Sequence, residues 1–445
     1  MARLGAFCFP GTGHINPMTA LARALERRGH RVVIFGIADT EARVRAAGIE
    51  FYRIGEQDYP LGTLRKLDEK LGQLKGLATF RFTVERVMNT ARMVLRDGPD
   101  AVRRANLDAL LVDEADMGGN VAEHLGLPFV SIAMFPPLIQ DDRIPPFCFG
   151  WPPGSDPISR LRNELGFRLL SRVAQPIFRV VNQQRRAWGL QPLRRSTDAL
   201  SKLAQIAQLP QALEFDVPKR PACLHYTGPF VDAQQRPPVA FPWERLDGRP
   251  LVYASMGTLQ NGSEIVFKTI AEACAGLHAQ LVISLGGGLE PARLGSLAGD
   301  PIVVGYAPQL EIVKRAALVI THAGLNTVLE SLAEGVPLVA IPLGNDQPGV
   351  AARVKARGAG LVVPRSKLTV KRLRRAVETV LREPSYREAA SALKVAMGKV
   401  DGPSVAAAII EQCLQLHGNA ALAPASPDGL MEMYPPAGIS METIG

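Results

Sequence analysis

The chain has 445 residues, of which 47% are hydrophobic and 21% are charged, as expected for a globular protein of two or three domains. Its formal net charge of +9 suits an anionic ligand or an acidic surface. Aromatic residues make up only 6% and are not interleaved with a basic tract, which argues against a nucleic-acid-binding protein. No apolar run approaches the roughly 18 residues of a membrane span. Because no signal peptide is visible and the five cysteines are widely spaced, we expect a cytoplasmic location.

The first half of the chain alternates apolar strands with helical segments. The predicted strands are Leu4–Phe9, Arg31–Gly36, Leu107–Val112 and Leu127–Ala133. Between the first two strands, Asn16 is expected to cap a helix that begins at Pro17, where the missing N–H of proline has no cost. This alternation predicts a doubly wound parallel sheet, and we assign residues 1–215 to this domain.

A proline-rich segment, Pro136–Pro157, lies inside this domain and is too irregular for a strand or a helix, so we expect a long functional loop. Residues 158–190 are expected to be helical with a break at Pro176, and they carry many arginines beside apolar side chains. That pattern fits either a solvated helix face packed on the domain or a basic amphipathic surface that touches an anionic membrane. Prolines recur further on, and we place the interdomain linker at residues 216–248.

A second series of strands and helices predicts another Rossmann-like domain over residues 249–400. Its most informative part is Gly305–Gln347. Within it, Ala317–Thr321 is predicted to be a buried strand, His322–Gly324 a tight turn, and Leu325–Gly335 a helix. A helix start presents backbone N–H groups and a partial positive charge, and both favour phosphate binding.

Polar side chains surround this predicted phosphate site. Asn326 and Thr327 lie in the first helical turn, and Glu330 lies one turn further, where it suits the hydroxyls of a ribose. Asp346 and Gln347 follow the next strand, so we expect them at the same strand-end crevice. This order predicts a site for a sugar nucleotide, with a diphosphate in the middle.

These residues resemble the donor-binding signature of the family 1 UDP-sugar glycosyltransferases. The resemblance covers Arg3 to about His417 and is closer to bacterial members, such as those that glycosylate carotenoids, macrolides or flavonoids, than to plant members. It implies the GT-B fold, an α/β architecture in which two Rossmann-like doubly wound parallel-sheet domains face a central cleft. It also implies that a helix at residues 401–418 packs back on the first domain. Residues 419–445 lack periodicity and are expected to be a flexible tail.

The resemblance further implies a donor site in the second domain, formed by Gly257, Thr258, Tyr306, Ala307, Gln309, His322, Gly324, Leu325, Asn326, Thr327, Glu330, Asp346 and Gln347. In such a site Tyr306 stacks on uracil and Glu330 holds the ribose. His322, Asn326 and Thr327 contact the diphosphate, and Asp346 with Gln347 holds the sugar hydroxyls. Leu325 departs from plant members, which often carry tryptophan there.

A sugar transferase that inverts the anomeric carbon must remove a proton from the acceptor hydroxyl. His14 suits this role, because an ordinary histidine has a pKa of about 6.5 and is largely neutral near pH 7. It ends the glycine loop after the first strand and is expected to face the cleft. Asp113, after a later strand, is the expected carboxylate partner, with Glu114 and Asp116 as alternatives. The family pattern G-H-x-x-P is present as residues 13–17.

The sequence therefore predicts an inverting transferase that moves a hexose, with glucose favoured, from a UDP-sugar to a hydroxyl of an apolar molecule resembling a carotenoid, a polyketide or a flavonoid. The candidate acceptor pocket consists of Phe135, Phe147, Phe149 and Trp151. No D-x-D metal motif is convincing, and the resemblance implies that no metal or other cofactor is required. We expect no nucleic-acid partner and leave peripheral membrane contact open.

Three other functions compete with this prediction. A dehydrogenase is disfavoured because the fingerprint that starts at Gly11 lacks its third glycine. A UDP-sugar epimerase of the same fold would need no acceptor pocket. A non-catalytic protein that binds nucleotide sugars would not need both His14 and Asp113.

Overall fold

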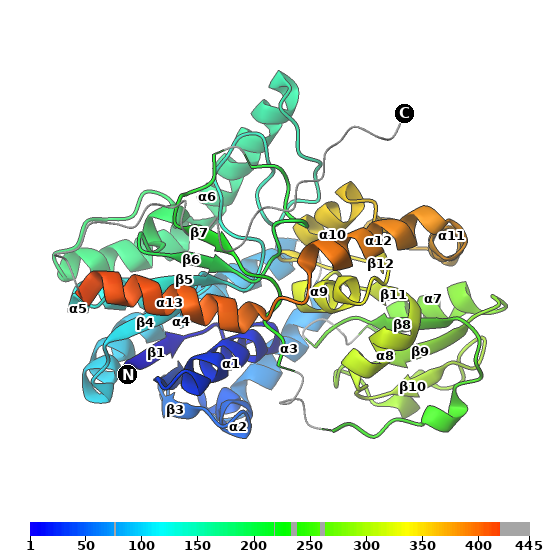
Figure 1. Ribbon diagram of the computed structural model, residues 1–445, viewed down its shortest axis with the longest axis horizontal. Helices are drawn as coiled ribbons and strands as arrows, with labels where there is room; N and C mark the ends of the chain where they lie inside the picture. Colours follow the sequence, from blue (N-terminus) through cyan, green and yellow to red (C-terminus); the bar gives the residue numbers. More distant parts are fainter. Residues whose placement is uncertain (75–76, 218, 233–237, 259–262, 419–445) are drawn as a thin grey trace.

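A computed structural model describes residues 1–74, 77–217, 219–232, 238–258 and 263–418. The chain forms two lobes that lie side by side, each built on a parallel β-sheet with helices packed on its faces (Figure 1). The predicted fold class is thus confirmed. The predicted tail, residues 419–445, lies outside the described residues.

The first sheet has the strand order β3-β2-β1-β4-β5-β6-β7, and all its pairings are parallel. The strands are β1 (Arg3–Phe7), β2 (Arg31–Gly36), β3 (Glu50–Arg53), β4 (Ala109–Asp113), β5 (Phe129–Ala133), β6 (Gln205–Ala207) and β7 (Leu224–Tyr226). The strand order reverses between β1 and β4, so the carboxyl ends of these two strands meet at a crevice suited to ligand binding.

The helices of this lobe are α1 (Thr12–Arg27), α2 (Ala38–Ala46), α3 (Thr63–Gln73), α4 (Leu77–Ala105), α5 (Gly118–Leu125) and α6 (Pro157–Ala187). Side chains of β1 alternate between two cores, as a strand buried on both faces requires. Leu4 and Ala6 pack in the same core as the apolar face of α1, whereas Phe7 packs in the core that α4 and α5 cover.

Helix α1 begins earlier than the sequence predicts. Its first residue is Thr12 and its N-cap is Gly11, so Asn16 and Pro17 lie inside the helix and the predicted cap is wrong. Pro17 has no N–H to donate to the carbonyl of Gly13, four residues back. The interior proline therefore leaves that carbonyl open to a partner outside the helix.

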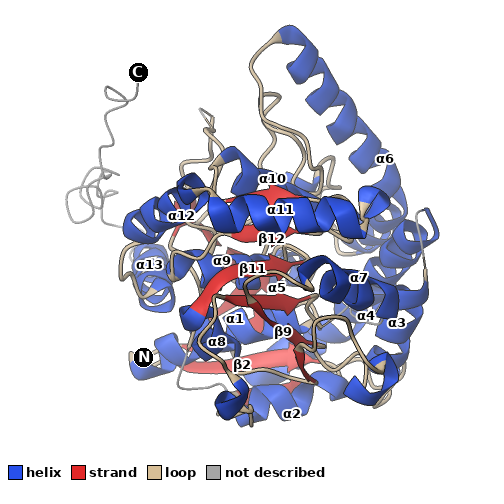
Figure 2. Ribbon diagram, turned by 90° about the vertical axis from the view of Figure 1, so that its right-hand side faces the viewer, coloured by secondary structure: helices blue, strands red, loops and turns tan. Residues whose placement is uncertain are grey.

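Helix α6 also differs from the prediction, because it continues through Pro176 without a break. Its C-terminal half packs along α4, and this tertiary support holds the helix despite the hydrogen bond that proline removes. Its N-terminal half projects from the body of the first lobe, as Figure 2 shows.

The second sheet has the order β10-β9-β8-β11-β12-β13 and is also parallel. The strands are β8 (Leu251–Ser255), β9 (Gln280–Ser284), β10 (Ile302–Val304), β11 (Ala316–Thr321), β12 (Leu338–Ala340) and β13 (Gly360–Val362). The helices are α7 (Glu264–Cys274), α8 (Gln309–Arg315), α9 (Leu325–Ala333), α10 (Gln347–Ala356), α11 (Val370–Arg382), α12 (Pro384–Met397) and α13 (Gly402–Gly418).

Two segments outside residues 1–215 also pack on the first lobe. Strand β7 lies within residues 216–248, which the sequence assigns to the linker, yet it pairs with β6 and extends the first sheet. That linker assignment begins too early, because the short run Leu224–Tyr226 completes the sheet edge. Helix α13 returns to the first lobe, where Ala406, Ala407 and Ile410 are buried in the core formed with α1.

Candidate active site

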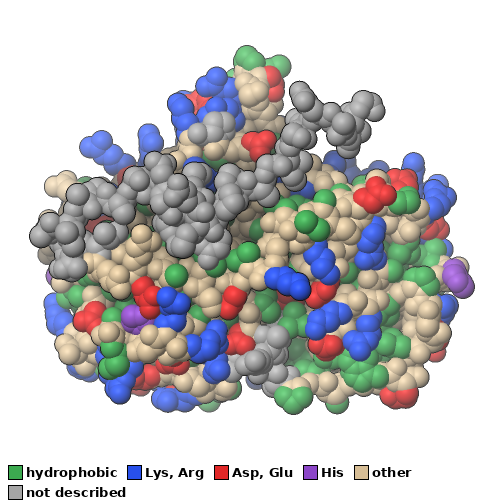
Figure 3. Space-filling view, viewed as in Figure 1, with side chains coloured by type: hydrophobic (Ala, Val, Ile, Leu, Met, Phe, Trp, Pro, Cys, Tyr) green, Lys and Arg blue, Asp and Glu red, His purple; other side chains and the backbone are tan. Residues whose placement is uncertain are grey.

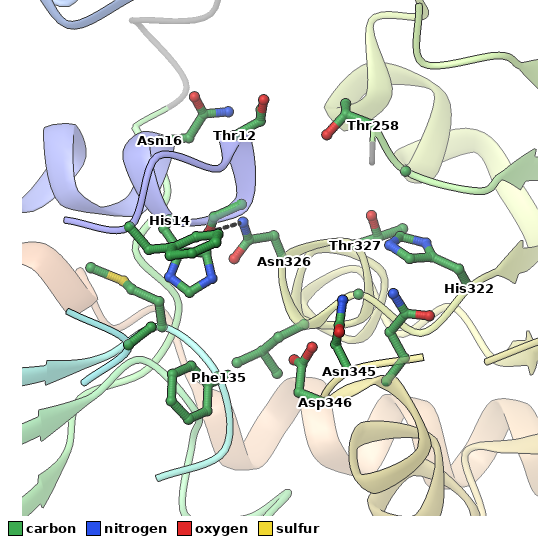
Figure 4. Close-up of a pocket in the computed structure, with 18 of the residues that line it drawn as sticks. Thr12, His14, Asn16, Phe135, Thr258, His322, Asn326, Thr327, Asn345 and Asp346 are labelled. Atoms are coloured by element: carbon green, nitrogen blue, oxygen red, sulfur yellow. Dashed lines mark hydrogen bonds between the residues drawn. The ribbon is translucent and has the colours of Figure 1, made fainter. Parts of the chain in front are cut away.

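A cavity of about 1690 Å³ lies between the two lobes. Pockets for single drug-sized ligands usually occupy ~300–1,000 Å³, so this space suits two ligands side by side. Every donor-site residue predicted from the sequence lines this cavity, as does His14. Figure 4 shows His14 and Phe135 on one side and Thr258, His322 and Thr327 on the other. The structure thus brings the predicted residues together around one space.

His14 and Asp113 form a close pair in the first lobe. The His14 Nδ1 atom lies 2.6 Å from Asp113 Oδ2, which fixes the imidazole so that Nε2 is the nitrogen left for a ligand. The carboxylate is fully buried and also accepts hydrogen bonds from the backbone N–H groups of Phe9, at 3.2 Å, and Ala115, at 3.0 Å. The pair stands where β1 and β4 end, as the sequence predicts.

The environment of His14 favours its charged form. Burial lowers the pKa of the imidazole, but the Asp113 carboxylate and its hydrogen bond outweigh that effect, with help from Asp346 and Asp116. The pKa of His14 therefore lies above its ordinary value of 6.5. A proton that reaches Nε2 is stabilised there by the buried carboxylate.

The opposite wall contains the Thr-His-Ala-Gly corner between β11 and α9. Burial lowers the pKa of His322 to about 4, so the imidazole is neutral near pH 7. Two glycines make room for this ring: a Cβ on Gly257 would lie 2.6 Å from it, and one on Gly324 would lie 2.4 Å from it. Gly257 also has a φ of 74°, which strains other residues. The corner therefore depends on glycine at both positions.

The part of the cavity predicted to hold the nucleoside is organised by side-chain hydrogen bonds. Gln309 Nε2 donates to Glu330 Oε2 at 2.6 Å, and the hydroxyl of Tyr253 donates to Gln309 Oε1 at 3.1 Å. Tyr306 is 57% exposed, and its hydroxyl lies over Gly287, where a Cβ would be only 2.0 Å away. More than half of the Tyr306 side chain is therefore accessible to a ligand.

Asn326 connects the two lobes across the cavity. Its Nδ2 donates to the carbonyl of Gly13 at 3.0 Å, and its Oδ1 accepts from Gln208 Nε2 at 3.0 Å. Both polar ends of this side chain are thus engaged by the first lobe, and Figure 4 shows the bond from Nδ2 as a dashed line. A contact between Asn326 and a diphosphate would require the exchange of at least one of these bonds.

Asp346 and Gln347 lie at the start of α10. Burial raises the pKa of Asp346, and the nearby charge of His14 opposes that rise. The Oε1 atom of Gln347 accepts from the backbone N–H groups of Leu343, at 2.8 Å, and Gly344, at 3.1 Å. The oxygen of Gln347 therefore shapes the loop, and its amide nitrogen is the part that suits a sugar hydroxyl.

The predicted acceptor residues divide into two groups. Phe135, Phe147 and Phe149 line the cavity beside His14, with the Phe135 and His14 ring centres 6.2 Å apart. Trp151 is not among the residues that line this cavity. Its ring centre lies 4.3 Å from that of Phe149, with the two rings tilted by 35°, and it packs on Gly166 of α6. An acceptor contact of Trp151 therefore stays a prediction.

Sequence reasoning missed two further parts of the lining. One is an apolar wall between α4 and α6, which includes Val84, Val87, Phe167, Leu170 and Ile177. Its signal was available, because these residues recur at helical spacing. The other is Glu114, considered only as a partner for His14. Burial raises its pKa to about 8, and its Oε1 finds no hydrogen-bond partner in the described part of the chain.

Among residues 1–74, 77–217, 219–232, 238–258 and 263–418, no cluster of three or more His, Cys, Asp or Glu side chains is arranged to hold a metal ion. The lining described above can support proton transfer at His14 and hydrogen bonding to an anion at the opposite corner.

Solved structures with this architecture are glycosyltransferases. The glycotransferase of kitacinnamycin aligns with a TM-score of 0.74 and 22% identity, over 93% of this chain and 99% of that one. The calicheamicin glycosyltransferase CalG4 aligns with a TM-score of 0.71 and 22% identity, over 95% and 100% of the two chains. The two-lobed fold is therefore the GT-B glycosyltransferase fold.

Sequence comparisons define the family. Residues 159–400 match the family described as UDP-glucoronosyl and UDP-glucosyl transferase, and residues 9–137 match the glycosyltransferase family 28 N-terminal domain. The zeaxanthin glucosyltransferase of Pantoea ananas is 30% identical over 93% of this chain and 96% of its own length. That of Pseudescherichia vulneris is 32% identical over 91% and 96%. The chain belongs to the UDP-glucoronosyl and UDP-glucosyl transferase family and is a UDP-glycosyltransferase.

Proposed function

We propose that this UDP-glycosyltransferase moves glucose from UDP-glucose to a hydroxyl of an apolar small molecule and inverts the anomeric carbon. The observation that carries the proposal is the His14–Asp113 pair, 2.6 Å apart, which faces the His322 corner across a single cavity. Relatives named zeaxanthin glucosyltransferase and 4'-demethylrebeccamycin synthase, the latter 29% identical, support an apolar acceptor.

In the proposed reaction, Nε2 of His14 takes the proton of the acceptor hydroxyl as the oxygen attacks the anomeric carbon. The new C–O bond forms on the face opposite the bond to UDP, which breaks and leaves its electron pair on the diphosphate. Asp113 stabilises the imidazolium that results. Gly257, Gly324 and Leu325 line the cavity, so in this proposal the growing negative charge on UDP meets the N-terminus of α9 and the turn at Gly257.

The experiment is a turnover assay with UDP-glucose and a panel of apolar acceptors that includes a carotenoid diol, a polyketide alcohol and a flavonoid phenol. We expect release of UDP together with an acceptor that has gained one hexose, in the β configuration by NMR. An α-linked product would contradict inversion. Conversion of the UDP-sugar without an acceptor would identify an epimerase, and binding without turnover of any acceptor would identify a sugar-nucleotide-binding protein.

A further inference from the structure

The projecting half of α6 has an apolar stripe that no part of the described chain covers. Ile158, Leu161, Leu165 and Leu169 are 81%, 57%, 51% and 54% exposed. They recur three or four residues apart, so they form one continuous line along the helix. We call these four residues the α6 stripe. Four large apolar side chains exposed in one line on a helix indicate a surface that binds an apolar partner.

The α6 stripe is separate from the face that packs on the protein. Asn163 and Gly166 are buried, and the Asn163 side chain donates to the Asp142 carbonyl at 2.9 Å. Phe167 and Leu170 lie between that buried face and the cavity, which they line. One side of α6 therefore contributes to the apolar wall of the cavity, and the other side, with the α6 stripe, faces solvent.

The charges around the α6 stripe have a surplus of arginine. The projecting half of α6 contains Arg160, Arg162, Arg168 and Arg172 against one glutamate, Glu164. Arg160 is paired with Asp142 and Arg168 with Glu164, each at 2.6 Å, so the surplus positive charge comes from Arg162 and the exposed Arg172. In Figure 3 the projecting top of the molecule shows hydrophobic side chains together with basic and some acidic ones. An apolar line bordered by arginines is the pattern of a helix that lies in the interface of an anionic membrane.

We propose that the α6 stripe docks this enzyme on an anionic lipid surface, and that an apolar acceptor passes from the lipid between α4 and α6 into the cavity. No helix in the described part of the chain is long and apolar enough to cross a bilayer, so the contact is peripheral. A second copy of the chain fits less well, because two stripes face to face would bring two sets of arginines together. Docking itself does not depend on the reaction, whereas acceptor delivery rests on the proposed function.

The first test is flotation with vesicles of phosphatidylcholine alone or mixed with phosphatidylglycerol, at low and high salt. We expect the full chain to float with the anionic vesicles and to detach as salt rises. The change Leu165→Glu should lower the partition coefficient at least about tenfold, since a leucine is then no longer buried in the interface. Arg172→Gln should lower it about fivefold.

Matched variants on the second lobe provide the controls. Val395 is 80% exposed on α12, so Val395→Glu changes an apolar surface residue outside the α6 stripe and should float like the wild type. Arg375, exposed on α11, provides the corresponding control as Arg375→Gln. Equal flotation of Leu165→Glu and Val395→Glu would overturn the proposal. The wild-type chain could also fail to bind anionic vesicles, sediment as a dimer and become a monomer in Leu165→Glu. That result would overturn membrane docking and assign the α6 stripe to self-association.

The second test separates docking from catalysis. We expect Leu165→Glu to turn over a water-soluble phenol at the wild-type rate but to lose at least about tenfold in rate with a carotenoid diol held in anionic vesicles. Vesicle binding without turnover of either acceptor would contradict the proposed function and leave docking supported. Equal loss with both acceptors would contradict acceptor delivery through the α6 stripe.

Discussion

The side chain of Asn326 donates a 3.0 Å hydrogen bond to the backbone carbonyl of Gly13, on the opposite lobe. That carbonyl has no partner within α1 at the position where one is usual, because residue 17, four positions later, is proline. The proline of the G-H-x-x-P pattern thus exposes an acceptor next to His14, and the second lobe binds it. Gln208 completes the connection by donating to Asn326 Oδ1.

Replacing Asn326 with alanine should loosen the two lobes, because it removes both hydrogen bonds. We expect faster amide exchange in the peptides around residues 13–20 and 205–210, measured by mass spectrometry. Asn326→Asp tests the direction of the bond, since a carboxylate would face the Gly13 carbonyl without a proton to donate. Exchange in either variant that matches the wild type would contradict a connecting role. Glu334→Ala, further along the same chain segment, is the control.

Replacing His14 with alanine should lower kcat by about 10²- to 10⁴-fold, the usual contribution of a general base. The base must be neutral, so the acidic limb of the pH–rate profile should lie above pH 6.5, in line with the raised pKa of His14. Asp113→Asn removes the charge that raises this pKa, and the limb should then move to lower pH while the plateau rate falls. A limb that stays in place would contradict the coupling of the pair.

Glu114 should affect how the KM for the acceptor depends on pH above pH 8. Its pKa of about 8 means that the side chain is a neutral acid at pH 7 and ionises above pH 8. This places a charge, which only the Leu138 N–H stabilises at 3.0 Å in the described part of the chain, at the predicted acceptor site. We expect the KM for the acceptor to rise above pH 8 in the wild type but not in Glu114→Gln, which stays neutral. Steady-state kinetics between pH 6 and pH 9.5 provide the measurement, and identical profiles for the two proteins would rule out this role.

Glu330 should matter for the nucleotide and not for the acceptor. It is buried and hydrogen-bonded to Gln309 at 2.6 Å, at the position predicted for the ribose. Glu330→Ala should weaken UDP binding by about 1–3 kcal/mol, measured by calorimetry, because a buried charge-assisted hydrogen bond is lost. The acceptor KM at saturating UDP-sugar should stay unchanged. Unaltered UDP affinity would show that Glu330 does not bind the ribose.

The junction of the lobes contains a buried ion pair. Arg353 of α10 donates to Glu214 Oε1 at 2.7 Å, and both side chains are 2% exposed. Arg353→Met should destabilise the protein by about 3–5 kcal/mol, because Glu214 is left charged and unpaired. Arg103→Met, at the exposed pair with Asp100, should cost less than about 1 kcal/mol. Thermal unfolding measures the stability of both variants. If the double variant Arg353→Met, Glu214→Met regains stability, the loss in Arg353→Met is due to the unpaired charge of Glu214.

Much of the fold was predictable because its signals are local. Alternating apolar strands and amphipathic helices indicate parallel sheets. The run from Thr321 to Gly324, which stands between an apolar strand and an amphipathic helix, indicates a tight turn at a strand end. The start of α1 was not predictable in the same way. Asn16 and Pro17 form a standard helix-start pattern, and the packing of the preceding turn against the second lobe overrides it.

Local sequence patterns thus predicted the two sheets and the strand–turn–helix unit around His322. The pair of His14 with Asp113, 99 residues apart, was predicted because strand ends in a parallel sheet converge by a general rule. The position of Trp151, the wall that α6 contributes, the burial of Glu114 with one oxygen lacking a partner in the described chain, and the contact of Asn326 with Gly13 came only from the folded chain. Each depends on which long-range neighbour a side chain meets, and a periodic pattern specifies a buried face without specifying what covers it.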